Sequence, residues 1–319
     1  MEIACLFNDI AQMAITGHEI PLCDIVGNER GRVPVSQLLS GRRGQQRPSA
    51  LLASYLPANL HLMLDGTTPL ETTVCNFDDN CFEFVRQGVR SPTVVFECGL
   101  GATLDWWTKV LPQVATHATA FAYNRPGYGR SRPTAECRDG DHIVGFLRRF
   151  LTTSGINPPF LLVGHSLGGL YTQLFARKYP EEVVGLVLVE STHPEQLMGA
   201  GARENWPTWF RIMFDSSFSD VTKAELACTT HTGQALMALP TFKGPVRVLT
   251  ATGPMGQEGT ELARDANAKR RDIVRLNPGA KQIWVEGSHA IPLEKPETVS
   301  NAILEILALL RADIVKVDV

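Results

Sequence analysis

The stretch Phe160–Tyr179 reads FLLVGHSLGGLYTQLFARKY. Its first four residues, 160–163, are all apolar, which is typical of a strand buried on both faces of a parallel sheet. From residue 167 onward the apolar side chains recur at helical spacing, which indicates a helix. Between the two, Gly164-His165-Ser166-Leu167-Gly168 matches the pattern G-x-S-x-G. The stretch therefore predicts a strand, a sharp turn that carries a serine, and a helix.

Ser166 is the predicted nucleophile of this turn. A serine on a sharp strand-to-helix turn is held in a strained backbone, with its Oγ exposed at the carboxyl end of the sheet. Glycines at 164 and 168 suit such a turn, because side chains there would collide with the neighbouring strand and helix. The N-terminal amides of the helix, beginning with Leu167, point at the site and can stabilise an oxyanion. The alternative is a glycine-rich turn with an ordinary exposed serine.

Strand and helix signals alternate along the rest of the chain. Apolar runs bounded by turn residues predict further strands at 60–64, 81–85, 93–97, 118–123, 183–189, 246–251 and 282–285. Helical spacing predicts helices at 104–116, 141–153, 261–276 and 297–311. We therefore expect an α/β fold whose central sheet is mostly parallel, flanked by helices, and begins with an antiparallel edge.

Residues 195–244 interrupt this alternation between two predicted strands. So long a segment, with aromatic side chains at helical spacing, is not expected to be a bare loop. We predict a small helical cap over the site, with an apolar substrate pocket lined by Trp206, Trp209, Phe210 and Met213. The alternative is that these aromatic side chains only pack the helices of the insert against one another.

The bulk composition excludes several classes of protein. The chain has 319 residues, 44% of them hydrophobic and 20% charged, enough for one large globular domain. A formal net charge of −3 argues against a general binder of nucleic acids or anionic membranes. No apolar run reaches about 18 residues, so no transmembrane segment is predicted. Seven cysteines without a C-x-x-C pair predict a reduced, cytoplasmic chain without a structural zinc site.

Residues 1–58 carry the weakest structural signals. Five arginines and no acidic residue fall between positions 30 and 64, and residues 41–48 have the composition of a flexible linker. We predict a poorly ordered N-terminal extension over 1–58, followed by one domain over 59–319 with its cap insertion at about 195–244. The alternative is a helical appendage that packs near the mouth of the site.

Three stretches of the sequence resemble the α/β-hydrolase superfamily, in its serine esterase and lipase-like branch. The strand–serine–helix stretch at 160–179 is similar to the family's nucleophile elbow. Asn124-Arg125-Pro126-Gly127-Tyr128-Gly129-Arg130-Ser131 resembles the family's D-R-P-G-Y-G-x-S turn, in which we expect Arg125 to anchor a loop by hydrogen bonds. The run from Gly287 to Glu297 resembles the stretch that carries the family's catalytic histidine. The resemblance covers about residues 60–312.

The resemblance implies a base and a second oxyanion donor. A serine hydroxyl needs a base to take its proton, and His289 follows the last predicted strand at the edge to which Ser166 points. In the family, the loop after the strand at 93–97 donates a backbone N–H to the oxyanion hole, which here implies Leu100. Cys98 stands in this loop where the family usually has histidine, but the donor is a main-chain amide. His165 is interpreted as a packing residue beside the site.

Two carboxylates are candidates for the acid that orients His289. Glu190 directly follows the predicted strand 183–189, and glutamate at this place is a known alternative in the superfamily. Glu258 is the carboxylate of the loop at 252–258, where the superfamily most often places aspartate. Loop spacing favours Glu190, and Glu258 remains the alternative.

Together these residues predict a serine hydrolase that cleaves carboxylic esters of small, largely apolar substrates through an acyl-enzyme. Neither a cofactor nor a metal is predicted. Serine at the elbow excludes the related dehalogenases and epoxide hydrolases, which attack with aspartate. An acyltransferase with the same triad and a non-catalytic ligand-binding protein of this fold are the alternatives, because fold and motif do not fix a substrate. The expected partner is a small-molecule ester, and the sequence predicts no oligomeric state.

Overall fold

A computed structural model describes residues 67–78, 80–253, 255 and 259–317, together with two short strands. These are β1 (Glu19–Pro21) and β2 (Arg32–Pro34), which pair in antiparallel fashion within the predicted N-terminal extension. The rest of residues 1–58 and the predicted strand at 60–64 lie outside the described residues.

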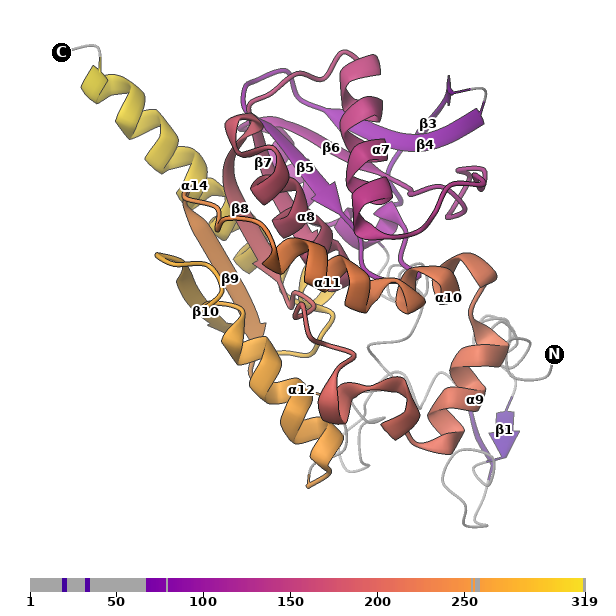
Figure 1. The fold of residues 1–319 in the computed structure, drawn as a ribbon. Coiled ribbons are helices and arrows are strands. Elements are labelled where there is room, and N and C mark those ends of the chain that lie inside the picture. The colour runs from indigo at the N-terminus through magenta and orange to yellow at the C-terminus, as the bar shows by residue number, and fades with distance from the viewer. Residues whose placement is uncertain are drawn as a thin grey trace.

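The described chain is built around a mixed sheet of eight strands in the order β10-β9-β8-β7-β5-β6-β4-β3 (Figure 1). The six strands from β10 to β6 run parallel, while β4 and β3 add an antiparallel edge. The predicted mostly parallel sheet is therefore confirmed. The strands are β3 (Thr73–Phe77), β4 (Asn80–Gln87), β5 (Thr93–Glu97), β6 (Thr119–Tyr123), β7 (Phe160–His165), β8 (Val183–Val189), β9 (Val246–Ala251) and β10 (Lys281–Val285).

The central strands are apolar throughout because both of their faces are covered. Every residue of β5, β6 and β7 is buried. Alternate side chains of β7 enter different cores. Leu162 packs on the side of α7 (Gly140–Thr153) and α8 (Leu167–Lys178), while Leu161 and Val163 pack on the side of α14 (Pro296–Val317). Figure 1 shows α7 and α8 on one face of the sheet and α14 on the other.

The helices that cover the sheet follow the predicted order with three differences in extent. They are η1 (Leu104–Trp107), α6 (Leu111–Ala115), α7 (Gly140–Thr153), α8 (Leu167–Lys178), η2 (Pro180–Glu182), α12 (Glu261–Asp272), α13 (Ile291–Glu294) and α14 (Pro296–Val317). The single helix predicted at 104–116 is wrong: it is divided into η1 and α6, because Pro112 has no N–H to continue a helix that started at 104. Helix α12 ends four residues earlier than predicted, and α14 runs six residues further.

The segment between β8 and β9 is helical. It contains η3 (Gly199–Gly201), η4 (Arg203–Asn205), α9 (Thr208–Ser217), α10 (Asp220–Ala227) and α11 (Thr229–Met237). Leu236 of α11 belongs to the core beneath α7 and α8, whereas α9 and α10 lie beyond the layered body in Figure 1. This segment therefore joins the core at one end and projects from it at the other.

Candidate active site

Ser166 occupies a strained turn at the centre of the sheet. It lies between β7 and α8 with φ 53° and ψ −122°, a conformation that is costly for a residue with a side chain. Backbone hydrogen bonds fix the turn: Ser166 N donates to Val189 O at 3.0 Å, and Ser166 O accepts from Gly169 N and Thr192 N, each at 2.9 Å. The surrounding backbone thus holds the serine in a conformation that it would not adopt alone.

The glycines of the motif allow the strand and helix to approach closely. A Cβ atom at Gly164 would lie 2.5 Å from Gly168 O and 2.6 Å from Gly169 Cα. A Cβ atom at Gly168 would lie 2.4 Å from Glu97 O, on the neighbouring strand β5. Both contacts involve backbone that cannot move away, so the steric role predicted for these glycines is confirmed.

His289 and Glu190 meet at the carboxyl end of the sheet. Glu190 directly follows β8, with φ 47°, and is 3% exposed. Its Oε2 lies 3.3 Å from His289 Nδ1, on the loop between β10 and α13. The structure therefore brings the favoured acid and the predicted base into contact, although they are 99 residues apart in the chain.

Glu190 is held as an anion. Its Oε1 accepts from Ala251 N at 2.6 Å, and its Oε2 accepts from Arg270 Nη1 at 3.2 Å. Burial alone would raise the pKa of Glu190, but the hydrogen bond and charge of His289, followed by the charge of Arg270, hold it below its ordinary value. An anionic carboxylate at this position can fix the tautomer of His289 with its proton on Nδ1.

His165 is packed beneath His289. Its Nε2 donates to His289 O at 2.9 Å, and its ring stacks on Trp106 with centroids 4.7 Å apart. Because the acceptor is a carbonyl, Nε2 carries the proton, and the buried Nδ1 has no hydrogen-bond partner among the described residues. Burial, and then the charge of His289, lower the pKa of His165 to about 3. His165 is thus a neutral packing residue that supports the backbone of His289.

The Ser166 hydroxyl makes no hydrogen bond within the described part of the chain, and none joins it to His289. Two backbone amides beside it are also without acceptors there: those of Leu100 and Leu167. The loop that carries Leu100 lies against the serine, since a Cβ atom at Gly99 would be 3.1 Å from Ser166 Cβ. The loop that carries Leu100 and the first residue of α8 therefore both adjoin the serine.

Two of the predicted pocket residues, Trp206 and Phe210, belong to a small aromatic cluster in the insert. The rings of Trp206 and Phe210 lie 4.9 Å apart, those of Trp206 and Phe214 5.8 Å, and those of Phe214 and Phe218 4.7 Å. The side chains of Trp209 and Met213 lie outside the described part, as does the alternative acid Glu258. The described rings pack on one another, from Trp206 before α9 to Phe218 directly after it.

Arg270 is a residue of the site that the sequence reasoning missed. It contacts Glu190 and also donates to Gly253 O, so it joins α12 to the ends of β8 and β9. Ala263, Ala266 and Arg270 are the buried residues of α12, at helical spacing. An arginine in the inward stripe of an otherwise polar helix was the available signal, because a buried guanidinium needs an anionic partner.

Within the described residues, one group of side chains has the spacing of a metal site. Potential ligand atoms of Cys137, Asp139 and His142 lie within 4.8 Å of one another. Asp139 already accepts from His142 N at 3.0 Å as the N-cap of α7, and a helix N-terminus disfavours a cation. These residues do not touch Glu190 or His289 through any described contact, so we assign them no part in the site.

Comparison with known proteins identifies the fold. A family model described as alpha/beta hydrolase fold matches residues 92–227. A putative lipase from Acinetobacter baumannii superposes with a TM-score of 0.55 at 18% identity, over 85% of this chain and 99% of the other. The chain has the α/β-hydrolase fold, and its residues 92–227 match the family model.

Two curated relatives match parts of this chain. An uncharacterised protein of Bacillus subtilis, YqjL, is 24% identical over 233 residues, which cover 69% of this chain and 85% of the relative. The mouse (lyso)-N-acylphosphatidylethanolamine lipase is 31% identical over 140 residues, 40% of this chain but only 38% of the lipase. Since the match to the mouse enzyme spans well under two thirds of it, that enzyme's activity does not transfer with the alignment. The described helices include none that is both long and apolar enough to cross a membrane.

Proposed function

We propose that this α/β-hydrolase is a serine hydrolase that cleaves carboxylic esters through an acyl-enzyme. Ser166 is the proposed nucleophile, His289 the base and Glu190 the acid that orients it. The observation that carries the proposal is the contact of 3.3 Å between His289 Nδ1 and Glu190 Oε2 at the edge where Ser166 occupies its strained turn. The order Ser, acid, His along the chain is the one this fold uses.

The proposed mechanism follows from which atoms are already engaged. Glu190 holds His289 through Nδ1, so Nε2 is the nitrogen left to take the proton of Ser166 Oγ as the oxygen attacks the ester carbonyl. The imidazolium then protonates the departing alcohol. A water molecule, activated by the same nitrogen, attacks the acyl-enzyme and releases the acid and Ser166.

Stabilisation of the tetrahedral oxyanion is assigned to the backbone N–H groups of Leu100 and Leu167. Support comes from their lack of other acceptors among the described residues and from the place of Leu167 at the first position of α8. The helix dipole adds a partial positive charge at that end. Loss of one such donor costs about 10²–10³ in kcat in a comparable hydrolase.

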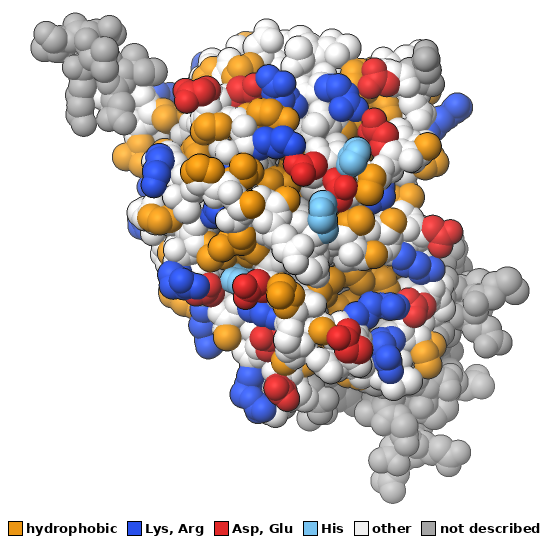
Figure 2. Space-filling view, viewed as in Figure 1, with side chains coloured by type: hydrophobic (Ala, Val, Ile, Leu, Met, Phe, Trp, Pro, Cys, Tyr) orange, Lys and Arg blue, Asp and Glu red, His pale blue; other side chains and the backbone are white. Residues whose placement is uncertain are grey.

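The proposed substrates are small, largely apolar esters. The aromatic insert supports this, with Trp206, Phe210, Trp209 and Met213 as the proposed pocket residues. On the face drawn in Figure 2, acidic and basic side chains are intermixed, so this face offers no field of one sign to a polyanion. We also propose the cytoplasm as the compartment, since the five cysteines of the described chain are all free thiols.

An ester panel with an alcohol acceptor tests this proposal. The chain is incubated with p-nitrophenyl acetate, butyrate and octanoate, with and without added glycerol, and both p-nitrophenol and the acyl products are measured. We expect release of p-nitrophenol and of the free acid in both conditions. Acyl-glycerol as the main product would identify an acyltransferase instead. Absence of turnover with every ester would contradict the esterase proposal.

A further inference from the structure

Arg125 is buried just after β6, and all the N–H groups of its guanidinium donate hydrogen bonds. Its Nη1 donates to Glu97 Oε1 and to Cys98 O, each at 2.6 Å, and its Nη2 donates to Gly99 O at 2.7 Å. On the other side, Nε and Nη2 donate to the two oxygens of Glu225 at 3.0 and 2.9 Å. These five bonds match the five N–H donors of arginine. The predicted loop anchor is thus confirmed, with a second attachment that was not predicted.

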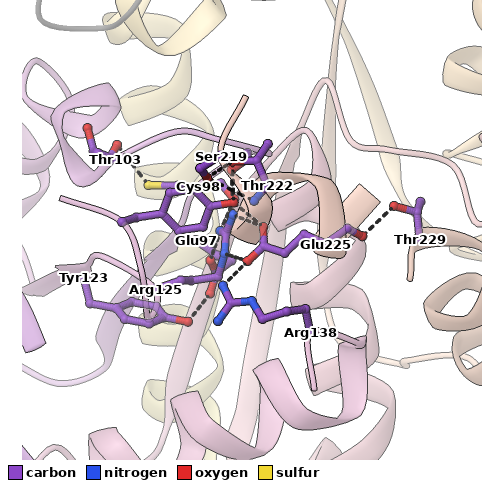
Figure 3. Close-up of polar contacts among 12 residues, drawn as sticks. Glu97, Cys98, Thr103, Tyr123, Arg125, Arg138, Ser219, Thr222, Glu225 and Thr229 are labelled. Atoms are coloured by element: carbon purple, nitrogen blue, oxygen red, sulfur yellow. Dashed lines mark hydrogen bonds and ion pairs between the residues drawn. The ribbon is translucent and has the colours of Figure 1, made fainter. Parts of the chain in front are cut away.

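Glu225 is the only acidic residue of α10 that is buried, with an exposed fraction of 0%. Besides Arg125, it accepts from Tyr128 OH at 2.9 Å and from Arg138 Nη2. Glu97, Arg125, Arg138 and Glu225 together form a buried ion-pair cluster of two acids and two bases (Figure 3). Loss of any one partner destabilises such a cluster, because the remaining charges stay buried without compensation.

The bonds from Arg125 set the direction of the Leu100 amide. In a trans peptide unit the C=O and N–H groups point in opposite directions. Gly99 O belongs to the same unit as the N–H of Leu100, and it points at Arg125. The Leu100 N–H therefore points away from the guanidinium, on the side where it has no acceptor among the described residues.

The helical insert touches the same loop from outside. Gly101 has φ 70°, and a Cβ atom there would lie 3.3 Å from the Phe218 ring and 3.5 Å from Thr222 Cγ2. Gly127 in the turn beyond β6 meets Val221 at 2.8 Å in the same way. The loop at 98–101 is thus enclosed between Arg125 and the start of α10, and Glu225 joins the two.

We propose that Glu225 is a positioning residue, which acts through Arg125 to hold the Leu100 N–H at the oxyanion site. This inference rests on the proposed function. It makes α10 part of the catalytic framework, in addition to any role of the insert in covering the substrate. Glu225 itself touches no reacting atom, since all its described contacts are to Arg125, Arg138, Tyr128 and Thr229.

The test compares Glu225→Gln and Glu225→Asp with Asp220→Asn. Gln keeps the shape but removes the charge, Asp keeps the charge at a shorter reach, and Asp220 is a fully exposed residue of the same helix. For each variant, kcat and KM are measured with p-nitrophenyl acetate. The Ki of a methyl trifluoromethyl ketone is measured as well, because this ketone forms a tetrahedral adduct that needs the oxyanion donors.

We expect Glu225→Gln to lower kcat about tenfold or more, with KM changed less than about twofold, as a displaced oxyanion donor requires. The Ki of the ketone rises by the same factor. Glu225→Asp recovers part of the loss in both quantities, and Asp220→Asn behaves as wild type.

A folded Glu225→Gln variant with wild-type kcat, or with reduced kcat and an unchanged ketone Ki, would overturn the inference. If Glu225→Gln does not fold, Glu225→Asp decides: wild-type kcat and Ki in that variant would refute a positioning role. A wild-type chain that neither hydrolyses the ester nor binds the ketone contradicts the proposed function itself, whereas an active wild type with unaffected variants contradicts this inference alone.

Discussion

Replacement of His165 by glutamine should remove a specific sensitivity of the fold to acid. Burial lowers the pKa of His165 to about 3 from an ordinary value of 6.5. Between these values the unfolded chain binds a proton at this residue and the folded chain does not. The unfolding free energy therefore falls as the pH falls below 6.5. The buried Nδ1 explains the resistance of the folded state, since a proton there would meet no acceptor among the described residues.

The magnitude follows from the two pKa values. Between pH 7 and pH 5, His165 alone accounts for a loss of about 2 kcal/mol of unfolding free energy. In His165→Gln this loss disappears, while the amide nitrogen of glutamine can replace Nε2 as the donor to His289 O. Urea unfolding at pH 7 and at pH 5 measures this change in unfolding free energy. The control is His117→Gln, which replaces an exposed histidine. The same pH dependence in wild type and His165→Gln would refute this account of His165.

Three further predictions concern the site and its frame. Glu190→Gln should lower kcat by about 10⁴, because glutamine cannot stabilise a protonated His289, while Glu258→Gln should change it little; the reverse pattern in ester kinetics would move the acid to Glu258. Gly164→Ala should destabilise the fold by about 1–3 kcal/mol in urea unfolding, because its methyl group would overlap Gly168 O and Gly169 Cα; an unchanged midpoint would disprove the close approach at the elbow. Across p-nitrophenyl esters, kcat/KM should be higher for uncharged acyl groups than for carboxylate-bearing ones of equal length; a preference for the charged esters would contradict the apolar pocket.

The parallel core of the fold was readable from the sequence because its strands are apolar on both faces. β8 and β9 occur at the predicted residues, and the β7–α8 unit follows from a run of buried residues and a glycine-rich turn. β3 was missed: its residues Thr73–Phe77 are mostly exposed, so the edge strand has no hydrophobic alternation to mark it.

Contacts between charged residues that are far apart in the chain could not be predicted from the sequence in this way. Glu225 lies in the segment DVTKAELA, which has the composition of a solvated helix, yet its partners Arg125 and Arg138 are 100 and 87 residues away. Burial of a charge depends on what the fold brings to it, and a single sequence does not contain that information locally. The contact between Glu190 and His289 was predicted from their places directly after two strands and from the order of residues that the resemblance supplied.

Covalent labelling with a fluorophosphonate tests the central claim, that Ser166 is an activated nucleophile. The wild-type chain, Ser166→Ala and a control serine variant, Ser154→Ala at the end of α7, are treated under native conditions and after unfolding in urea. Intact-mass and peptide-mapping measurements should show one adduct per native chain, on the peptide that contains Ser166, in wild type and Ser154→Ala. Ser166→Ala and the unfolded chains should carry none. A native wild-type chain without an adduct, or equal labelling of Ser166→Ala, would contradict the account.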